Sequence, residues 1–300
     1  MTNEFKSGFV TIVGRPNVGK STLLNALTGE KIAIVSNKPQ TTRNKVLTIL
    51  TDDSSQIIFV DTPGVHSPRT KLGEYMNRVV TDAVNEVDAV LFVTEAGNKL
   101  MNNEKEMLKN LFDKKLSVIL VINKADTLSN KEDLLAQIQD ASTVGDFSAI
   151  VPISALRKDG VKSVLEEIKN LLPVGPMYYP EDMITDQTER EIVSEIIREK
   201  MLRLLDKEVP HGTAVEIEYM KEGDTLTKIG AVIFCEKGSH KGIIIGKNGE
   251  MLKRIGSYAR ADIEKLLDKK VFLELWVKVK EDWRNSNFLL KEFGYKEEEE

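Results

Sequence analysis

The sequence predicts two α/β domains: a mostly parallel sheet with helices on both faces, followed by a smaller α+β domain. Three observations support this. Continuous apolar runs alternate with amphipathic helical patterns, as is typical of parallel sheets covered on both faces. A glycine-rich turn joins the first run to the first helix. The length of 300 residues exceeds the usual size of one domain.

The elements of the first domain follow one another as strand and helix. The first strand covers 8–14 and its helix 21–29; residues 46–60 form two strands joined by a polar turn, which predicts one antiparallel edge. Three further strands are expected in 88–97, 116–126 and 147–155, and four further helices in 71–87, 102–114, 131–142 and 160–172. We place this domain at 1–173.

A change of composition marks the boundary between the domains. Residues 172–186 contain three of the nine prolines, so we place a linker at 174–187. Beyond it we expect a helix at 188–207, strands at 212–220 and 226–237, helical patterns on both sides of a turn at 246–249, and a strand at 270–280. This second domain is placed at 188–283, and 284–300 is set apart as a C-terminal tail that ends in the charged run 296–300.

Composition excludes several classes of protein. The chain is 41% hydrophobic, yet it has no apolar run of about 18 residues and no apolar signal-peptide core. A single cysteine, Cys235, excludes an internal disulfide framework and favours a cytoplasmic protein. The three histidines are scattered and predict no zinc site.

Charge is unevenly distributed along the chain. The net charge is −5, but the segment 237–270 carries nine Lys and Arg against four Asp and Glu. That segment predicts one anion-binding face. An ordinary solvated helix face would show the same charge pattern, so charge alone leaves both readings open.

The turn between the first strand and the first helix has the spacing of a P-loop. "GRPNVGKS" matches G-x-x-x-x-G-K-[ST], in which glycines let backbone N–H groups surround phosphates. Lys20 is expected to reach the β- and γ-phosphates and the Ser21 hydroxyl to bind Mg²⁺. The residues expected to contact the nucleotide here are Gly14, Arg15, Pro16, Asn17, Val18, Gly19, Lys20, Ser21 and Thr22.

The base is predicted by "NKAD", which follows a later strand. The Asp126 carboxylate can accept hydrogen bonds from both N1 and N2 of guanine, and adenine offers no such pair. Lys124 would lie along the ring and Asn123 would tie this loop to the P-loop. Ala125, and Ser154 and Ala155 at the end of the next strand, complete the predicted guanine contacts.

The motif "DTPG" ends another strand and supplies the remaining metal and phosphate contacts. Asp61 would hold Mg²⁺ through water, and Gly64 would sense the γ-phosphate; Thr62, Pro63 and Val65 are expected beside the nucleotide. In "QTTRN" we favour Thr42 over Thr41 as a further metal ligand. The predicted metal ligands are therefore Ser21, Thr42 and Asp61, and these loops would release on hydrolysis.

Hydrolysis itself is expected to be slow. Ras-like enzymes orient the attacking water with a glutamine just after this glycine, whereas here Val65 stands there. Asn17 is a candidate to hold K⁺ beside the phosphates; the alternative is that it only shapes the loop. The residues assigned catalytic roles are Lys20, Thr42, Gly64 and Asn17.

A second glycine–lysine turn, "GKNG" at 246–249, has different chemistry. It has no Ser or Thr after the lysine and no neighbouring metal ligand, and it fits the G-x-x-G loop by which KH domains clamp single-stranded RNA. Ile244, Leu252 and Ile255 would form core and groove floor, and Arg260 would track phosphates. The predicted RNA contacts are Lys241, Ile243, Ile245, Gly246, Lys247, Asn248, Gly249, Lys253 and Arg254.

These motifs in this order resemble the Era family of bacterial GTPases over nearly the whole chain. The motifs are GRPNVGKS, QTTR, DTPG, NKAD, the proline-rich linker, HGTAVEIE and IIIGKNGEMLKRIG. The resemblance implies a P-loop GTPase domain followed by a type II KH domain. It implies that the chain binds GTP or GDP, Mg²⁺ and the 3′ end of 16S rRNA, and acts in small (30S) ribosomal subunit assembly and 16S rRNA maturation. It also implies a cytoplasmic monomer with peripheral membrane contact.

Two alternatives stay open from the sequence. One is a regulatory switch whose KH-like domain binds mainly a protein partner. The other is a GTP-dependent RNA-modifying enzyme, which would need a nucleophile or cofactor site in the second domain; Cys235 is the only thiol there.

Overall fold

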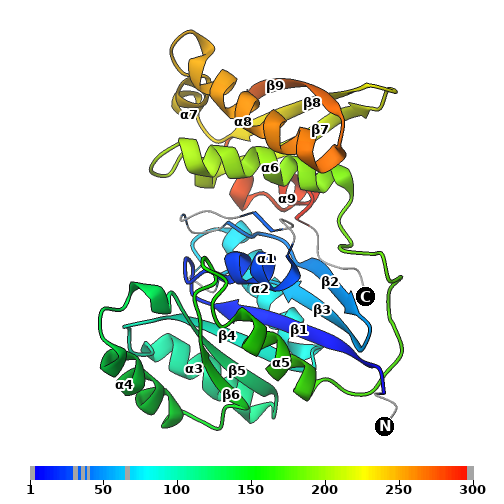
Figure 1. Cartoon of the computed structure of the whole chain (residues 1–300). Helices are drawn as coiled ribbons and strands as arrows, with labels where there is room; N and C mark the ends of the chain where they lie inside the picture. Colours follow the sequence, from blue (N-terminus) through cyan, green and yellow to red (C-terminus); the bar gives the residue numbers. More distant parts are fainter. Residues whose placement is uncertain (1–3, 30–32, 35–37, 39–40, 65–67, 296–300) are drawn as a thin grey trace. The chain divides into compact units, whose positions relative to one another are not determined.

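A computed structural model of the chain describes residues 4–29, 33–34, 38, 41–64 and 68–295. The chain divides into two compact units (Figure 1). Unit 1 comprises Met1–Ala33, Thr42–Ser67 and Met76–Asp186, and unit 2 comprises Ile34–Thr41, Pro68–Tyr75 and Gln187–Glu300.

The described part of unit 1 is built on a six-stranded sheet with the order β2-β3-β1-β4-β5-β6. Only β2 runs antiparallel to its neighbour, as expected from the short polar turn between it and β3. The strands are β1 (Lys6–Gly14), β2 (Val46–Asp52), β3 (Ser55–Asp61), β4 (Ala89–Glu95), β5 (Ser117–Asn123) and β6 (Ala149–Pro152).

Helices cover both faces of this sheet, so the predicted fold class of the first domain is confirmed. Helices α1 (Lys20–Thr28) and α5 (Val161–Leu171) pack on one face, where Leu23 and Ile168 are fully buried. Helices α3 (Asn102–Asp113) and α4 (Lys131–Ser142) pack on the other, together with the C-terminal part of α2 (Lys71–Asn85). Because helices cover both faces of the central strands, the functional loops lie at the strand ends.

The segment predicted as a linker is bound to the edge of this sheet. The Ile49 amide donates to the Ile184 carbonyl at 2.9 Å, and the Thr185 hydroxyl donates to the Leu47 carbonyl at 2.7 Å. Nearer its start, the amides of Tyr178 and Tyr179 donate to the side-chain oxygen of Gln56 at 2.8 and 3.0 Å. Most of this proline-rich segment is therefore an integral part of unit 1.

Unit 2 contains the predicted order α-β-β-α-α-β. A three-stranded sheet, β7-β8-β9, pairs β7 with β8 antiparallel and β8 with β9 parallel. Helix α6 begins after Thr188, whose hydroxyl accepts from the Glu191 amide in a capping box. The elements are α6 (Glu189–Leu204), β7 (Thr213–Lys221), β8 (Leu226–Cys235), α7 (Gly238–Ile245), α8 (Glu250–Leu267) and β9 (Lys270–Val279).

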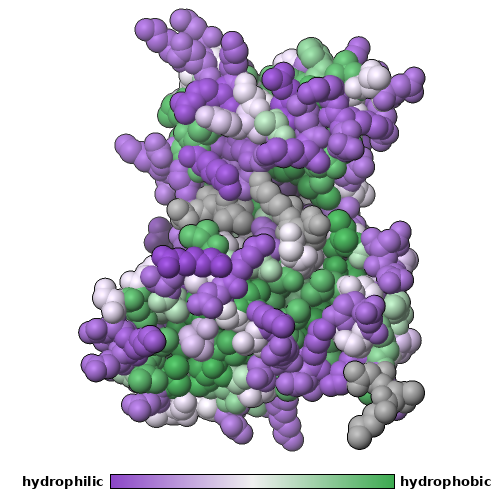
Figure 2. All heavy atoms as spheres, viewed as in Figure 1, coloured by the Kyte–Doolittle hydropathy of each residue, from purple (hydrophilic) through white to green (hydrophobic). Residues whose placement is uncertain are grey.

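The helices of unit 2 cover one face of its sheet. Side chains from α6, α7 and α8 form one apolar core with the inward residues of the strands, including Cys235, which is fully buried. Hydrophilic side chains cover most of unit 2 over α6 and α8 in Figure 2, as expected for the outward side of such helices. The fold class predicted for the second domain is thereby confirmed.

The described part of the C-terminal segment 284–300 folds onto unit 2, whereas its charged last residues, 296–300, lie outside the described residues. Helix α9 (Asn287–Glu292) lies in this segment. Trp283 is fully buried, donates from Nε1 to the Gly212 carbonyl at 3.0 Å, and packs edge-on against Phe293. Phe293 in turn lies 4.7 Å from the ring of Phe234 on β8. Buried aromatic contacts therefore stabilise a helix too short to form alone.

None of the helices in the described ranges is both long and apolar enough to cross a membrane. Within those ranges, likewise, no three His, Cys, Asp or Glu side chains gather as metal ligands.

Candidate functional site

The P-loop lies between the end of β1 and the start of α1, and its two glycines are required by geometry. Gly14 and Gly19 have positive φ angles of 147° and 100°. A Cβ at Gly14 would lie 2.2 Å from the Val93 carbonyl oxygen, and one at Gly19 would lie 2.2 Å from Asn123 Nδ2. Any side chain at either position would therefore push the loop away from the neighbouring strand ends.

Lys20 is buried within this loop. Its Nζ donates to the carbonyl oxygens of Gly14 and Arg15, both at 3.0 Å, and only 7% of the residue is exposed. Burial lowers the pKa of Lys20 to about 8, while the negative charge of Asp61 acts in the opposite direction. A buried cation whose desolvation is only partly compensated by Asp61 favours an anionic ligand beside it.

The three predicted metal ligands lie together. The hydroxyl groups of Ser21 and Thr42 are 3.2 Å apart, and they lie 3.4 and 3.3 Å from Asp61 Oδ2. Burial raises the pKa of Asp61 to about 6, although Lys20 and both hydroxyls lower it. Among the described residues, the buried Oδ1 of Asp61 has no hydrogen-bond partner. Three oxygen donors with one unsatisfied carboxylate oxygen fit a hard divalent cation such as Mg²⁺.

Asn123 connects the P-loop with the loops predicted to read guanine. Its Nδ2 donates to the Val18 carbonyl at 2.8 Å, and its Oδ1 accepts from the Ala155 amide at 3.0 Å. The next residue, Lys124, has a left-handed φ of 64°, and its Nζ contacts Glu95 Oε1 at 3.0 Å. The structure thus brings the ends of β5 and β6 beside the P-loop.

Asp126, the predicted base reader, lies at the start of this loop with 16% of its side chain exposed. Arg157 Nε contacts its Oδ2 at 3.2 Å, and the Arg157 amide donates to the Ser154 hydroxyl at 3.2 Å. The Ala125 amide donates to the Ile153 carbonyl at 2.9 Å. A carboxylate oriented by its own loops can accept two hydrogen bonds from one base edge.

Several residues were predicted to contact the nucleotide, and the side chains of some of them pack or form hydrogen bonds within the protein. Val18 is buried in the core, and the Thr62 hydroxyl donates to the Ile12 carbonyl at 2.9 Å. Asn17 is exposed and has a left-handed φ of 67°. Pro63 is buried and Thr22 half-buried, and Gly64 lies so close to the P-loop that a Cβ would be 3.0 Å from the Pro16 nitrogen. Val65 lies outside the described residues.

Two buried side chains near this site were missed by sequence reasoning. Glu104 on α3 accepts from Arg15 Nε at 2.9 Å and from the Met101 amide at 2.9 Å, so the Arg15 side chain is tied to α3. Gln137 on α4 donates to the Glu95 carbonyl at 3.0 Å. The 89 positions between Arg15 and Glu104 explain the omission, because spacing along the chain does not indicate such pairs.

The second glycine–lysine turn joins α7 to α8 through a single 3₁₀ turn, η3 (Lys247–Gly249). Gly246, Asn248 and Gly249 have φ angles of 73°, 52° and 79°. A Cβ at Gly246 would lie 2.7 Å from the Met251 Cβ, whereas one at Gly249 would meet nothing within 4 Å. Lys247 and Asn248 are exposed, so the loop presents backbone and one cation to solvent.

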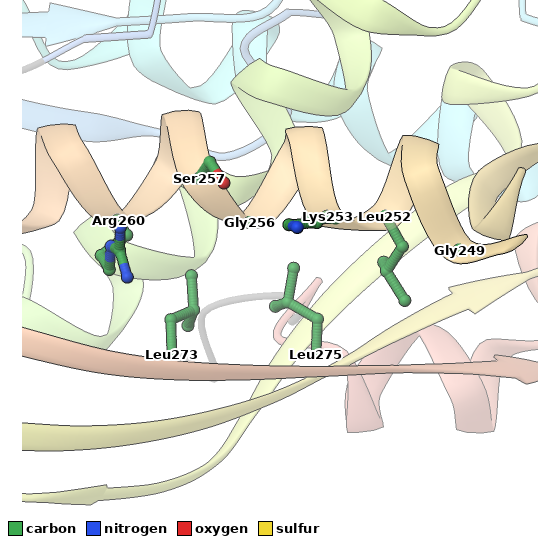
Figure 3. A pocket seen from close by; sticks show the side chains of 8 residues that line it. All are labelled: Gly249, Leu252, Lys253, Gly256, Ser257, Arg260, Leu273 and Leu275. Atoms are coloured by element: carbon green, nitrogen blue, oxygen red, sulfur yellow. The ribbon is translucent and has the colours of Figure 1, made fainter.

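A groove of about 470 Å³ begins at this turn and runs between α8 and β9. Figure 3 shows Leu273 and Leu275 pointing from β9 toward α8, with Leu252 pointing from α8 toward the strand. Lys253 and Arg260 line the same groove. An apolar floor with basic residues along one side suits bases and phosphates of a single strand.

The predicted RNA contacts are distributed unequally around this groove. Gly249 and Lys253 line it, whereas Ile244 and Ile255 are fully buried core residues and Ile243 is half exposed. Arg254 is exposed, Lys241 and Ile245 are half-buried, and none of these three lines the groove. Sequence reasoning missed Gly256, Ser257, Leu273 and Leu275; the alternation along β9 is the signal that could have identified the two leucines.

The structure therefore defines a P-loop nucleotide-binding domain and a KH domain in one chain, and comparisons with known proteins agree. The family described as 50S ribosome-binding GTPase matches residues 9–124. The KH domain family matches residues 208–284.

Relatives match over almost the full length. GTPase Era of Ruminiclostridium cellulolyticum is 55% identical over 294 residues, covering 98% of each chain, and GTPase Era of Clostridium kluyveri is 56% identical over 293 residues, covering 97% of this chain and 99% of the relative. This chain belongs to the Era family of GTPases.

Solved structures of Era are similar over the whole chain as well. A structure of Era in complex with MgGDPNP and nucleotides 1506–1542 of 16S ribosomal RNA has a TM-score of 0.94 and 40% identity, covering 97% of this chain and 99% of that one. A variant of Aquifex aeolicus Era bound to GDP·AlF₄⁻ gives the same values.

Proposed function

We propose that this protein binds and hydrolyses GTP and that its KH domain binds the 3′ end of 16S rRNA during small ribosomal subunit assembly and 16S rRNA maturation. The observation that carries the proposal is the full-length similarity to Era in complex with MgGDPNP and 16S rRNA nucleotides. Both sites described above have the residues that such ligands require.

Each group of the nucleotide site has a proposed role. The P-loop amides and Lys20 bind the phosphates, and Asp126 selects guanine through its two oxygens. Ser21, Thr42 and Asp61 would hold Mg²⁺, which when bound would neutralise negative charge on phosphate oxygens. Thr42 lies 3.3 Å from Asp61, and we propose that its segment is held in place when GTP is bound and is released when the γ-phosphate is lost.

Hydrolysis is proposed to be slow, because Val65 cannot orient water. Asn17 is proposed to hold K⁺ beside the phosphates, since it is exposed within the P-loop. The test is turnover in K⁺ and Na⁺ buffers of equal ionic strength, with Asn17→Ala as control. Faster turnover in K⁺ that is lost in Asn17→Ala is expected; equal rates in both salts would exclude a cation at Asn17.

The RNA function is tested by crosslinking the full chain to small-subunit RNA with GDP or with GDPNP. We expect crosslinks to the 3′ end of 16S rRNA whose yield differs between the two nucleotides. The Lys247→Glu, Lys253→Glu double variant should lose them, because Lys253 lines the groove and Lys247 lies in the exposed turn at which it begins. Retention of the crosslinks in that variant would instead favour a KH-like domain that binds protein.

Four further expectations accompany this proposal. The protein is proposed to be a cytoplasmic monomer that contacts the membrane only peripherally, which light scattering and cell fractionation would check. The domain limits are proposed at 1–173, 174–187 and 188–283, with 284–300 as the C-terminal segment; limited proteolysis would locate them.

A further inference from the structure

The sheet of unit 2 has a second face, which α6, α7 and α8 do not cover; the described C-terminal segment covers only its part around Phe234, whose ring lies 4.7 Å from that of Phe293. Side chains alternate along each strand, so the residues between those of the core point to the opposite side. This outer face is defined here by Tyr219, Lys221, Lys228, Gly230, Phe272 and Trp276. The pairings of Gly230 with Tyr219 and of Lys228 with Phe272 place them in adjacent rows of the sheet.

Three aromatic rings gather on the outer face. Phe272 and Trp276 lie four residues apart on the same face of β9, and they are 50% and 40% exposed. Tyr219 on β7 lies 6.5 Å from the Trp276 ring. Gly230 on the intervening strand makes this possible, because a Cβ there would lie 2.3 Å from the Tyr219 ring. The tyrosine therefore lies across β8 toward the Trp276 ring on β9, and Phe272 lies on the same face of β9, with Glu274 between it and Trp276.

The unpaired charges on this face are positive. Lys221 Nζ lies 5.7 Å from the centre of the Tyr219 ring, and Lys228 is exposed. Within the described part of the chain, neither lysine forms an ion pair with a carboxylate.

The carboxylates of the same face are mostly engaged. Glu274 accepts the hydroxyl proton of Tyr219, and Glu218 pairs with Lys278 at 2.9 Å. Glu216 on β7 is half-buried. Aromatic rings beside free lysines are the combination by which proteins bind single-stranded nucleic acid.

Strand β9 joins this face to the groove. Its inward residues Leu273 and Leu275 line the groove, and the outward residues Phe272 and Trp276 alternate with them. In the described residues β9 pairs only with β8, so its other side is an open edge. An RNA strand that leaves the groove over this edge crosses only β9 before it reaches the aromatic rings.

We propose that RNA held in the groove continues around the β9 edge and that its next bases stack on Trp276 and Phe272 of the outer face. The inference rests on the proposed RNA function and extends it, since it assigns a second contact surface for the same single strand. It predicts that affinity depends on RNA length beyond the groove.

The test uses the full chain and single-stranded RNAs from the 3′ end of 16S rRNA. One fills the G-x-x-G groove with about four nucleotides, and two others carry about four more at either the 5′ or the 3′ end. One extended RNA should bind about 5- to 150-fold more tightly than the short one, the range expected for stacking one base. It should also quench tryptophan fluorescence, which Trp276 reports because Trp283 is fully buried.

Variants separate stacking from other effects. Trp276→Ala should remove the gain from extension and leave the short RNA unaffected, whereas Trp276→Phe should keep most of it. Phe288→Ala, which removes a 78% exposed aromatic outside the sheet, is the matched control and should change nothing.

The outcomes are distinguishable. If the short RNA binds and neither extension adds affinity or quenching, the inference is wrong, and the outer face is left for a protein partner. If no RNA binds at all, the proposed RNA function fails with it.

Discussion

The two glycine–lysine loops differ in what surrounds them. The glycines of the P-loop, Gly14 and Gly19, are both pressed against neighbouring strand ends, and Lys20 is buried. In the G-x-x-G turn, Gly246 packs against Met251, but Gly249 has open space around it and Lys247 is exposed. The closed loop is therefore shaped for one ligand of fixed size, whereas the open loop can hold a backbone that continues on either side.

The largest expected effect is on the closed loop. Lys20→Ala should raise the Kd for GTP about 100-fold or more, because a desolvated cation that contacts phosphate is lost. Binding of a short RNA, titrated without nucleotide, should stay within about twofold.

Lys247→Ala should do the reverse, weakening RNA binding and leaving the Kd for GTP unchanged. Both constants come from equilibrium titrations of the same preparations. A variant that weakened both ligands equally would show that the two loops are not independent sites.

The glycines should differ in their cost to stability. Gly19→Ala combines a left-handed backbone with a close contact to Asn123 and should cost at least about 2 kcal/mol of unfolding free energy. Gly249→Ala has the backbone strain alone and should cost about 1 kcal/mol. Calorimetry of the full chain measures both. Equal costs would contradict the contrast between a closed and an open loop.

The positive charges of the groove that begins at the open loop should make RNA binding depend on salt concentration. Lys253→Gln and Arg260→Gln each remove one cation from the groove and should each reduce the slope of log K against log salt by about 0.7. Lys265→Gln, an exposed cation on the same helix that does not line the groove, is the control and should leave the slope unchanged.

The smallest effect on stability is expected for the surface ion pair of Asp52 and Lys169, which lies outside both loops. Partial burial alone would raise the pKa of Asp52, but hydrogen bonds from Lys169 and Ser54 outweigh it and hold the pKa well below its usual range. The stabilisation is therefore complete above the unfolded pKa of about 4 and is lost as the pH falls below it.

Asp52→Asn should cost less than about 1 kcal/mol at pH 7, because the carboxylate is partly exposed, and the difference from wild type should shrink toward pH 2. Unfolding free energies at both pH values measure this. A constant difference would mean that the charge of Asp52 is not its cause.

Periodicity and local motifs predicted the sheet of unit 1, the order of elements in unit 2 and both loops. They succeeded because Gly14, Lys20, Ser21 and Gly249 act through backbone geometry and short spacing, which a sequence records directly. The pairing of Ser21 with Asp61 also followed, since parallel strands end at the same edge.

Long-range contacts were not predictable in the same way. The C-terminal segment was set apart as a tail, and its helix depends on Trp283 and Phe293 packing on residues far away in sequence. Nothing in the sequence around Glu104 indicates its contact with Arg15. The linker lacks periodicity, so nothing indicated that Ile184 pairs with Ile49.

That last pairing has a consequence for synthesis of the chain. Strand β2 is a sheet edge, and uncovered edges are templates for aggregation. The segment that covers this edge is synthesised late, because 138 positions separate Leu47 from Thr185. At translation rates of about 5 to 20 residues per second, the nascent edge stays uncovered for on the order of ten seconds. Chains that stall in this interval would be the ones most prone to associate with one another.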